Sequence, residues 1–555
     1  MLSIQSLRTR KWVASAAILI AGLIAISSAG VTGTGNASQP RAGTAGNCPT
    51  VTAGSELASK AQLRRMTAKF NSFGPRILGS RSHNRAIDWL EDRSRTLGLR
   101  VQSGRFKPYA WLPDTRFRNR PGLDIGAAGN LTVRRSGGSS LRIPDAGAVH
   151  WSKPAAAGRS GSLVYLPPDQ EITAENSAGK VVIRDFVLGS IPFGLLGPLL
   201  GVYQSPDLEG YDDYTRPYLS PNLQVDSLAA SKAGAAGVIF AFDVPAKQVR
   251  GYYDPHTGTI YRQPEVFVGR AEGERLKALA AQGASATVKV KAHIVRKPTR
   301  NLIARLPGRS NEKIVVVANT DGTSWVQENG VIGMLAMARY YAKLPMSCRP
   351  RTLEFVFSTA HDAFRDDGLN PDHYDLDHKT TVFGFGLEHL GTREIVPLGE
   401  GADRRLKFTG RMDPGIFGAG DSQVLRDVAA QAVIRRDLPR TAVLKGLGVP
   451  DPNTAPSICS MGGLGTVFQR EAVPTLAIIS GPWSLYDPAF GAKALDFGHM
   501  RNQLLAATDA VLALDGLPRP EIAGDYPALQ AQLDQGLKQP CPPEIFPLHA
   551  PGPGS

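Results

Sequence analysis

The sequence predicts an α/β fold in which a doubly wound, mostly parallel sheet carries a small inserted β-rich domain. From residue 301 onward, short apolar runs alternate with amphipathic segments, as strands and helices do in such a sheet. Between about 129 and 295, short β-like runs follow one another with few helical segments. At 555 residues the chain exceeds one ordinary core, which also favours two domains.

The elements of the main sheet follow from its apolar runs and amphipathic segments. Its predicted strands are 314–318, 353–358, 382–387 and 475–479, and its predicted helices are 328–344, 420–434 and 499–514. Two further amphipathic helices are expected between 59 and 98, joined by a turn-rich connector at 73–80. The segment 188–222, rich in apolar residues and tyrosine, is predicted to fold as a loop on the inserted domain, with a lid or contact surface as the alternative.

These patterns divide the chain into five parts. They are 1–30 (signal peptide or signal anchor), 31–58 (flexible spacer), 59–128 with 300–516 (main α/β domain), 129–299 (inserted domain) and 517–555 (Pro-rich tail).

The N-terminus predicts export. Arg8, Arg10 and Lys11 precede an apolar run, 13–26, which has the length of a signal-peptide core and is short for a membrane span. The protein is therefore expected to be secreted or associated with the cell envelope. Retention by an uncleaved N-terminal anchor is the alternative.

Composition and charge describe a globular protein with a basic surface. Apolar residues make up 42% of the chain and charged residues 20%. The net charge of +14 is not gathered into a dense basic run, and no nucleic-acid-binding motif is present. We therefore expect no nucleic-acid partner, whereas anionic envelope polymers or a membrane surface are plausible neighbours. No feature of the sequence specifies an oligomeric state.

Four cysteines, at positions 48, 348, 459 and 541, are expected to form two disulfides in an exported chain. Three pairings are possible.

Polar side chains follow all four predicted strands. Asn319 and Asp321 come after the first strand, with Glu328 at the start of the next helix. His361 with Asp362 follow the second, Glu388 with His389 the third, and Asp487 lies a little beyond the fourth. Because strands of an open α/β sheet bring ligands to their carboxyl ends, this set predicts a site for zinc or another divalent metal. Taken singly, each residue has a structural explanation, such as a helix-dipole role for Glu328, a turn for Asp321 or a core position for His389.

Other chemistries lack their motifs. The sequence contains no GxSxG, no HExxH, no P-loop and no GxGxxG after a strand. The acidic loop 365–378 is expected to be a solvated surface loop.

Residues 60–515 resemble the M28 family of zinc peptidases that carry an inserted protease-associated (PA) domain. The resemblance rests on FGPRILGSRSHNRAIDWLEDRSRTLGLRV (73–101), on the PA-like segments GKVVIRDF, LAASKAGAAGVIFAF and PEVFVGRAEGERLKALAAQG, and on IVVVANTDG, LEFVFSTAHD and FGLEHLG. It implies a zinc-exopeptidase-like fold and a two-metal site.

The resemblance also implies altered metal ligands. Asn319 stands where the family has its first histidine ligand, and Asp321 is kept. The remaining positions are taken by Glu328 for the bridging aspartate, His361 and Asp362 for the paired glutamates, Glu388 for the later aspartate, and Asp487 as the nearest candidate for the last histidine.

Two hypotheses of function follow. The first is a metal-dependent hydrolase of peptide or amide bonds, with His361 as general base and with a metal held by Asp321, Glu328, Asp362, Glu388 and His389. The second is a peptidase-fold binding or scaffold protein of the envelope without catalysis and without metal, motivated by Asn319 and the missing last histidine.

Overall fold

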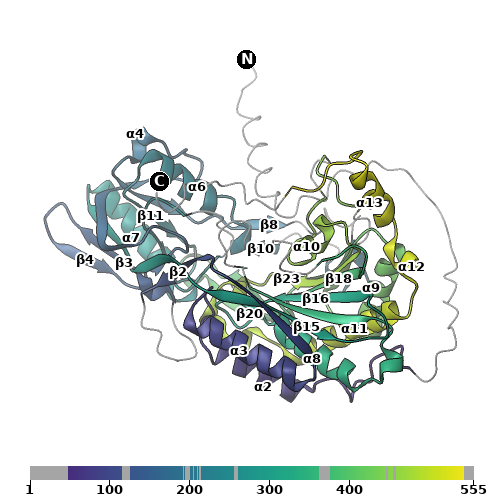
Figure 1. Ribbon diagram of the computed structural model, residues 1–555. Helices are drawn as coiled ribbons and strands as arrows, with labels where there is room; N and C mark the ends of the chain where they lie inside the picture. The colour runs from purple at the N-terminus through teal and green to yellow at the C-terminus, as the bar shows by residue number, and fades with distance from the viewer. Residues whose placement is uncertain are drawn as a thin grey trace.

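The computed structural model describes residues 48–114, 125–191, 193, 200–203, 205–208, 211, 214–254, 260–359, 361, 376–444, 448–453 and 458–542. These residues form a large α/β body and a smaller β-rich body beside it (Figure 1).

The large body is built on a nine-stranded sheet with the order β1-β15-β17-β16-β18-β23-β21-β22-β9. Its strands are β1 (Arg100–Phe106), β9 (Leu200–Val202), β15 (Thr299–Leu306), β16 (Lys313–Asn319), β17 (Thr352–Ser358), β18 (Thr381–Leu387), β21 (Gly415–Ala419), β22 (Thr441–Leu444) and β23 (Thr475–Ser480). The four central strands β17, β16, β18 and β23 are parallel, and antiparallel strands flank them. The predicted α/β class is confirmed, with the parallel strands at its centre.

Helices cover both faces of this sheet. They are α2 (Lys60–Asn71), α3 (Arg81–Thr96), α8 (Gly330–Lys343), α9 (Gln423–Arg435), α10 (Gly465–Arg470), α11 (Phe497–Asp515), α12 (Arg519–Ala523) and α13 (Tyr526–Asp534). In Figure 1, α2, α3, α8 and α11 lie below the sheet and α10 above it. Strand β16 is buried on both faces: Val316 packs into the core on one face, and Val315 and Val317 pack into the core on the other. Its centre therefore consists of apolar residues only.

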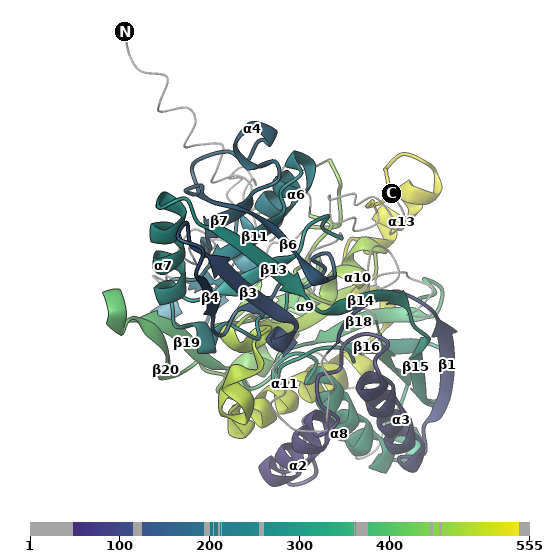
Figure 2. The same ribbon diagram turned by 90° about the vertical axis from the view of Figure 1, so that its left-hand side faces the viewer.

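The smaller body has its own eight-stranded sheet, with the order β4-β3-β13-β6-β7-β11-β12-β5. It consists of β3 (Gly129–Arg134), β4 (Ser140–Ile143), β5 (Gly147–Ala148), β6 (Ala155–Tyr165), β7 (Val181–Asp185), β11 (Gly237–Ala241), β12 (Glu265–Val268) and β13 (Ser285–Val290), with helices α4 (Ala174–Ser177), α6 (Leu223–Ala233) and α7 (Arg270–Ala281). A separate hydrophobic core fills it. The ribbon of β2 (Tyr109–Pro113) and β14 (Ala292–Arg296) leads from this body into the large one (Figure 2).

Glu265 is a fully buried carboxyl in the smaller body. It accepts hydrogen bonds from the Ser227 hydroxyl (2.9 Å) and the Gln263 amide (2.5 Å), but burial raises its pKa from 4.5 to about 8. The Glu265 carboxyl therefore binds a proton more tightly in the folded protein than in the unfolded chain. The resulting stabilisation is complete below pH 4.5 and is lost as the pH rises to about 8.

Substitution of Glu265 by glutamine is expected to stabilise the protein at pH 9 and not at pH 4. Each pKa unit is worth about 1.4 kcal/mol and one hydrogen bond is lost, so we expect a net gain of roughly 2 kcal/mol. Urea unfolding at several pH values measures it. A variant that follows the wild-type pH dependence between pH 4.5 and 8 would contradict the raised pKa.

The described parts of segment 188–222 do not fold only on the smaller body, as the sequence had predicted. Strand β9 pairs with β22 and extends the large sheet, while β8 (Gly189–Ile191) pairs with β10 (Tyr214–Arg216). Phe193, Leu208 and Tyr214 pack with Leu444 of β22 in one apolar cluster. The prediction of a loop folded on the inserted domain is therefore wrong, because this segment also pairs and packs with the large body.

The disulfides are Cys48–Cys348 and Cys459–Cys541. The expected signal peptide, residues 1–30, lies outside the described residues, as do 31–47 of the spacer and 543–555 of the tail. None of the helices in the described part of the chain combines the length and the apolar character that a bilayer crossing needs.

Candidate functional site

The central strands end at one edge of the large sheet because they run parallel. Asn319 ends β16 beside Ser358 of β17, and both are buried. Asp321, His361 and Glu388 follow β16, β17 and β18 respectively. This edge is where an open α/β sheet places its ligands.

A buried histidine–carboxylate pair is the main feature of this edge. The Glu328 carboxylate contacts Nδ1 of His361, and the two side chains are 1% and 10% exposed. The amide nitrogen of Gln327 lies 3.3 Å from the same ring nitrogen. Glu328 has φ = 67°, an unusual backbone conformation for a glutamate, two residues before α8 begins. A contact at Nδ1 orients the imidazole so that Nε2 is the nitrogen that would exchange a proton with a substrate.

Asp321 connects the ends of β16 and β17. It is fully buried, and its Oδ1 accepts a hydrogen bond from the backbone N–H of His361 (3.2 Å). The predicted residues Asp321, Glu328 and His361 therefore lie together.

Glu388 and His389 form a second pair after β18. Nδ1 of His389 lies 2.6 Å from the carbonyl oxygen of Ser480, which can only accept, so Nδ1 carries a proton. Nε2 of His389 lies 4.0 Å from Oε1 of Glu388. A neutral His389 would thus present the lone pair of Nε2 to a carboxylate.

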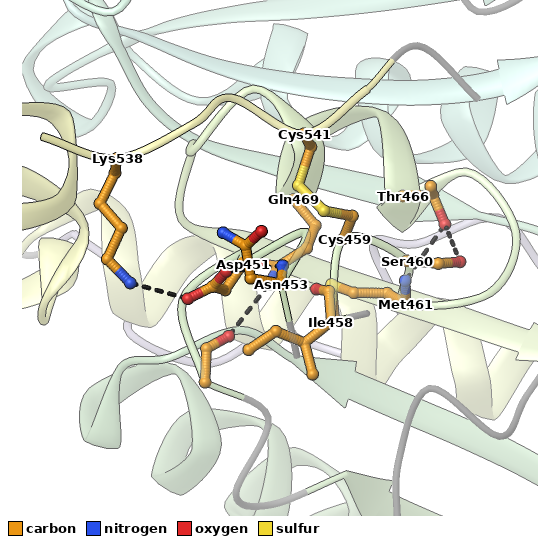
Figure 3. The surroundings of a disulfide bond; sticks show 11 residues. Asp451, Asn453, Ile458, Cys459, Ser460, Met461, Thr466, Gln469, Lys538 and Cys541 are labelled. Atoms are coloured by element: carbon orange, nitrogen blue, oxygen red, sulfur yellow. Dashed lines mark hydrogen bonds and ion pairs between the residues drawn. A yellow bond between two sulfur atoms is a disulfide. The ribbon is translucent and has the colours of Figure 1, made fainter. Parts of the chain in front are cut away.

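A loop after the second disulfide holds Glu388 in place. The backbone N–H of Leu464 donates to Oε2 of Glu388 (2.6 Å). Gly463 has φ = 59°, and a Cβ there would lie 2.0 Å from the same oxygen, so the carboxylate requires glycine at this position. Figure 3 shows Cys459 bonded to Cys541 at the start of this loop. Sequence reasoning missed the loop, for which the consecutive glycines 462 and 463 were the available signal.

Tyr486, which sequence reasoning also missed, lies near the first pair. Its ring centroid is 6.1 Å from that of His361. Burial raises its pKa well above the usual value, and the charges of Asp254, Glu328 and Glu388 add to the shift, so its hydroxyl keeps its proton. Its carbonyl accepts from the N–H of Tyr253 (2.9 Å), which brings residues of the smaller body to the site.

The other predicted ligands have different positions. Oδ1 of Asp487, the nearest candidate for the last histidine ligand, accepts from the N–H of Ala489 and caps a short 3-10 turn. Asp362 and most of the acidic loop 365–378 lie outside the described residues. Within the described ranges, no three His, Cys, Asp or Glu side chains are grouped so that they could hold a metal ion.

Comparison with known proteins identifies the fold. No family model and no curated protein matches the sequence. Among solved structures, the chain is similar to an aminopeptidase from Aneurinibacillus sp. strain AM-1 (16% identity, TM-score 0.50, 90% of this chain and 99% of that chain covered). It is also similar to the zinc aminopeptidase BSAP from Bacillus subtilis (16%, 0.51, 84% and 98%) and to a peptidase M28 precursor from Shewanella amazonensis SB2B (14%, 0.53, 82% and 97%). At these identities the shared property is the fold, which is the mixed α/β fold of M28-type zinc aminopeptidases.

Proposed function

We propose that the protein is an exported hydrolase of peptide or amide bonds that depends on a divalent metal held by altered M28-type ligands. The observation that carries this proposal is the buried pair of His361 and Glu328 at the ligand-binding edge of an aminopeptidase-like sheet. A buried imidazole oriented by a carboxylate is the usual arrangement of a general base.

The side chains of the predicted ligands are of the types that bind divalent cations. Buried carboxylates and an imidazole are the ligands that zinc prefers, and Zn–N and Zn–O bonds are about 2.0–2.2 Å long. Asp321, Glu328, Glu388 and His389 would hold the metal, together with Asp362. When bound, the metal would polarise the substrate carbonyl and lower the pKa of water.

The residues of the chain supply the proton transfers. Nε2 of His361 takes a proton from the attacking water as its oxygen bonds to the carbonyl carbon. The C–N bond then breaks, and His361 returns the proton to the leaving amine. Glu328 holds the ring in position throughout and stabilises the imidazolium that forms. The protonated hydroxyl of Tyr486 is available as a hydrogen-bond donor in the same site.

The proposal extends to the smaller body and to the location of the protein. The sequence between 129 and 299 supports a PA-like domain, and its Tyr252–Asp254 segment beside Tyr486 would border the substrate site. Two disulfides are typical of exported proteins, and they support secretion or envelope association.

A binding protein without catalysis is the second candidate. Two observations favour it. Asn319, and not a histidine, ends β16. Among the described residues, no three acidic, cysteine or histidine side chains are grouped as metal ligands. Such a protein would bind peptides or envelope polymers without turnover.

Elemental analysis of the secreted protein, purified without added metal, separates the two candidates. We expect stoichiometric zinc or a related divalent metal, and hydrolysis of a peptide panel that a chelator abolishes and added metal restores. Folded, metal-free protein without hydrolysis in the presence of added zinc, manganese or cobalt would refute the hydrolase and favour the binding protein.

A further inference from the structure

His83 is a buried histidine outside the residues that the sequence singled out. It lies in the first turn of α3, and its side chain has no exposed surface. Burial, together with the nearby charges of Arg76 and Arg300, lowers its pKa from 6.5 to about 3, so the ring is neutral at physiological pH.

The hydrogen bonds of His83 fix its tautomer. Nδ1 lies 3.2 Å from the backbone nitrogen of Gly79, which can only donate, so Nδ1 accepts and the proton is on Nε2. Nε2 lies 2.9 Å from the hydroxyl of Thr320. Gly79 has φ = 69°, and a Cβ there would lie 2.6 Å from Cβ of Lys297, so a side chain at this position would disturb the donor.

The hydrogen bonds of Thr359 independently show that His83 donates to Thr320. The hydroxyl of Thr359 donates its single proton to the carbonyl of Arg300 (2.9 Å), so it must accept from Thr320, 2.7 Å away. Thr320 therefore donates to Thr359 and accepts from His83. One chain of hydrogen bonds runs from Gly79 through His83, Thr320 and Thr359 to β15.

This chain holds the two loops that carry the candidate site. Thr320 follows β16 and precedes Asp321 directly, and Thr359 follows β17 two residues before His361. The two site residues also contact each other directly, through the 3.2 Å hydrogen bond from the N–H of His361 to Oδ1 of Asp321. Both threonines are fully buried, so water cannot replace a lost partner without entering the core.

We infer that His83 is a positioning residue for the proposed hydrolase: it joins Thr320 to α3 and thereby sets the spacing between Asp321 and His361. This inference rests on the proposed function, but it concerns a residue that touches neither substrate nor metal. Its role is comparable to that of the groups behind a metal ligand, whose loss typically costs 10- to 100-fold in activity.

The test uses four single variants of the full chain, together with the double variant His83→Leu/Thr320→Val. His83→Leu removes both hydrogen bonds, Thr320→Val removes the hydroxyl at nearly constant shape, and His83→Gln retains a donor that can reach Thr320. Ser94→Ala is the matched control, because Ser94 is equally buried in the same helix and its hydroxyl donates to the carbonyl of Leu90 within that helix.

We expect His83→Leu and Thr320→Val each to lower kcat about 10- to 100-fold with little change in KM. The double variant should lose no more than Thr320→Val alone, because that substitution already removes both the contact with His83 and the contact with Thr359. His83→Gln should recover much of the loss, and Ser94→Ala should keep wild-type kcat. Full kcat in His83→Leu, or additive losses in the double variant, would overturn the inference.

Two measurements decide the inference even if the wild-type protein hydrolyses nothing. NMR of the histidine ring should show the Nε2-protonated neutral tautomer of His83 from pH 5 to 9. Amide hydrogen exchange in 319–322 and 359–361 should be faster in His83→Leu than in wild type or Ser94→Ala. Absence of hydrolysis would refute the proposed function alone, whereas unchanged exchange in both loops would refute the role of His83.

Discussion

Substitution of His361 by alanine is expected to lower kcat/KM for peptide hydrolysis by about 10²- to 10⁴-fold, the usual contribution of a general base. The imidazole is mostly buried and is oriented through Nδ1 by Glu328, so no other described group would take the proton of the attacking water in the same geometry. Steady-state kinetics on the substrate that the wild-type protein cleaves fastest measures the loss.

Two further variants test whether the loss of activity arises from the His361–Glu328 pair. Glu328→Gln keeps the shape of the side chain but removes its charge, and we expect a loss of about 10- to 100-fold, because the orientation of the ring is weakened. His293→Ala is the control, since His293 lies in β14 with a side chain that is 65% exposed, and it should retain full activity. Unimpaired hydrolysis by His361→Ala would exclude this residue as the base.

The central strands were predictable because each is buried on both faces. Strands such as β16 read as continuous apolar runs, and the polar residues that follow them stand out. The edge strand β9 and its neighbour β22 gave no comparable signal. They have three and four residues, and β9 becomes a strand only because segment 188–222 reaches the far edge of the large sheet. Long-range pairing of this kind has no local pattern.

The same distinction applies to the site. Asp321, His361 and Glu388 could be predicted because they follow strands whose ends must meet. The partners of these residues could not be predicted, because Leu464, Tyr486 and the His83 network come from elements far away in sequence. Glu328 was expected either at a helix start or in a metal site. It precedes α8 in a left-handed conformation, and its carboxylate contacts His361. Neither feature could be predicted from a helix-dipole role or from the position of Glu328 in the sequence.

Substitution of Asp413 by asparagine is expected to lower the free energy of unfolding by about 3–5 kcal/mol, because it leaves an uncompensated buried charge. The partner is Arg216 of β10, whose Nη2 lies 2.5 Å from Oδ1 of Asp413, and neither side chain is exposed. The guanidinium also stacks on Tyr214, whose hydroxyl lies 3.2 Å from Oδ2 of Asp413. Urea unfolding of the full chain gives the free-energy difference.

A matched surface pair shows whether burial is the cause. Asp403 and Arg405 form an ion pair beside strand β20 (Arg405–Met412), with side chains that are 92% and 48% exposed. Asp403→Asn should therefore change the free energy of unfolding by less than about 1 kcal/mol. Equal effects at the two sites would contradict a cost that arises from burial.

The paired substitution Arg216→Met with Asp413→Leu separates the cost of a stranded charge from the value of the ion pair. Replacement of both partners by apolar groups removes the need to desolvate either charge, so the double variant should be more stable than Asp413→Asn and close to wild type. The pair ties segment 188–222, which carries Arg216, to Asp413 of the large body, and Tyr214 of the same segment donates to the carbonyl of Gly481 directly after β23, beside the candidate site. If the double variant is stable but less active, the ion pair would serve to fix the position of this segment and not to stabilise the fold.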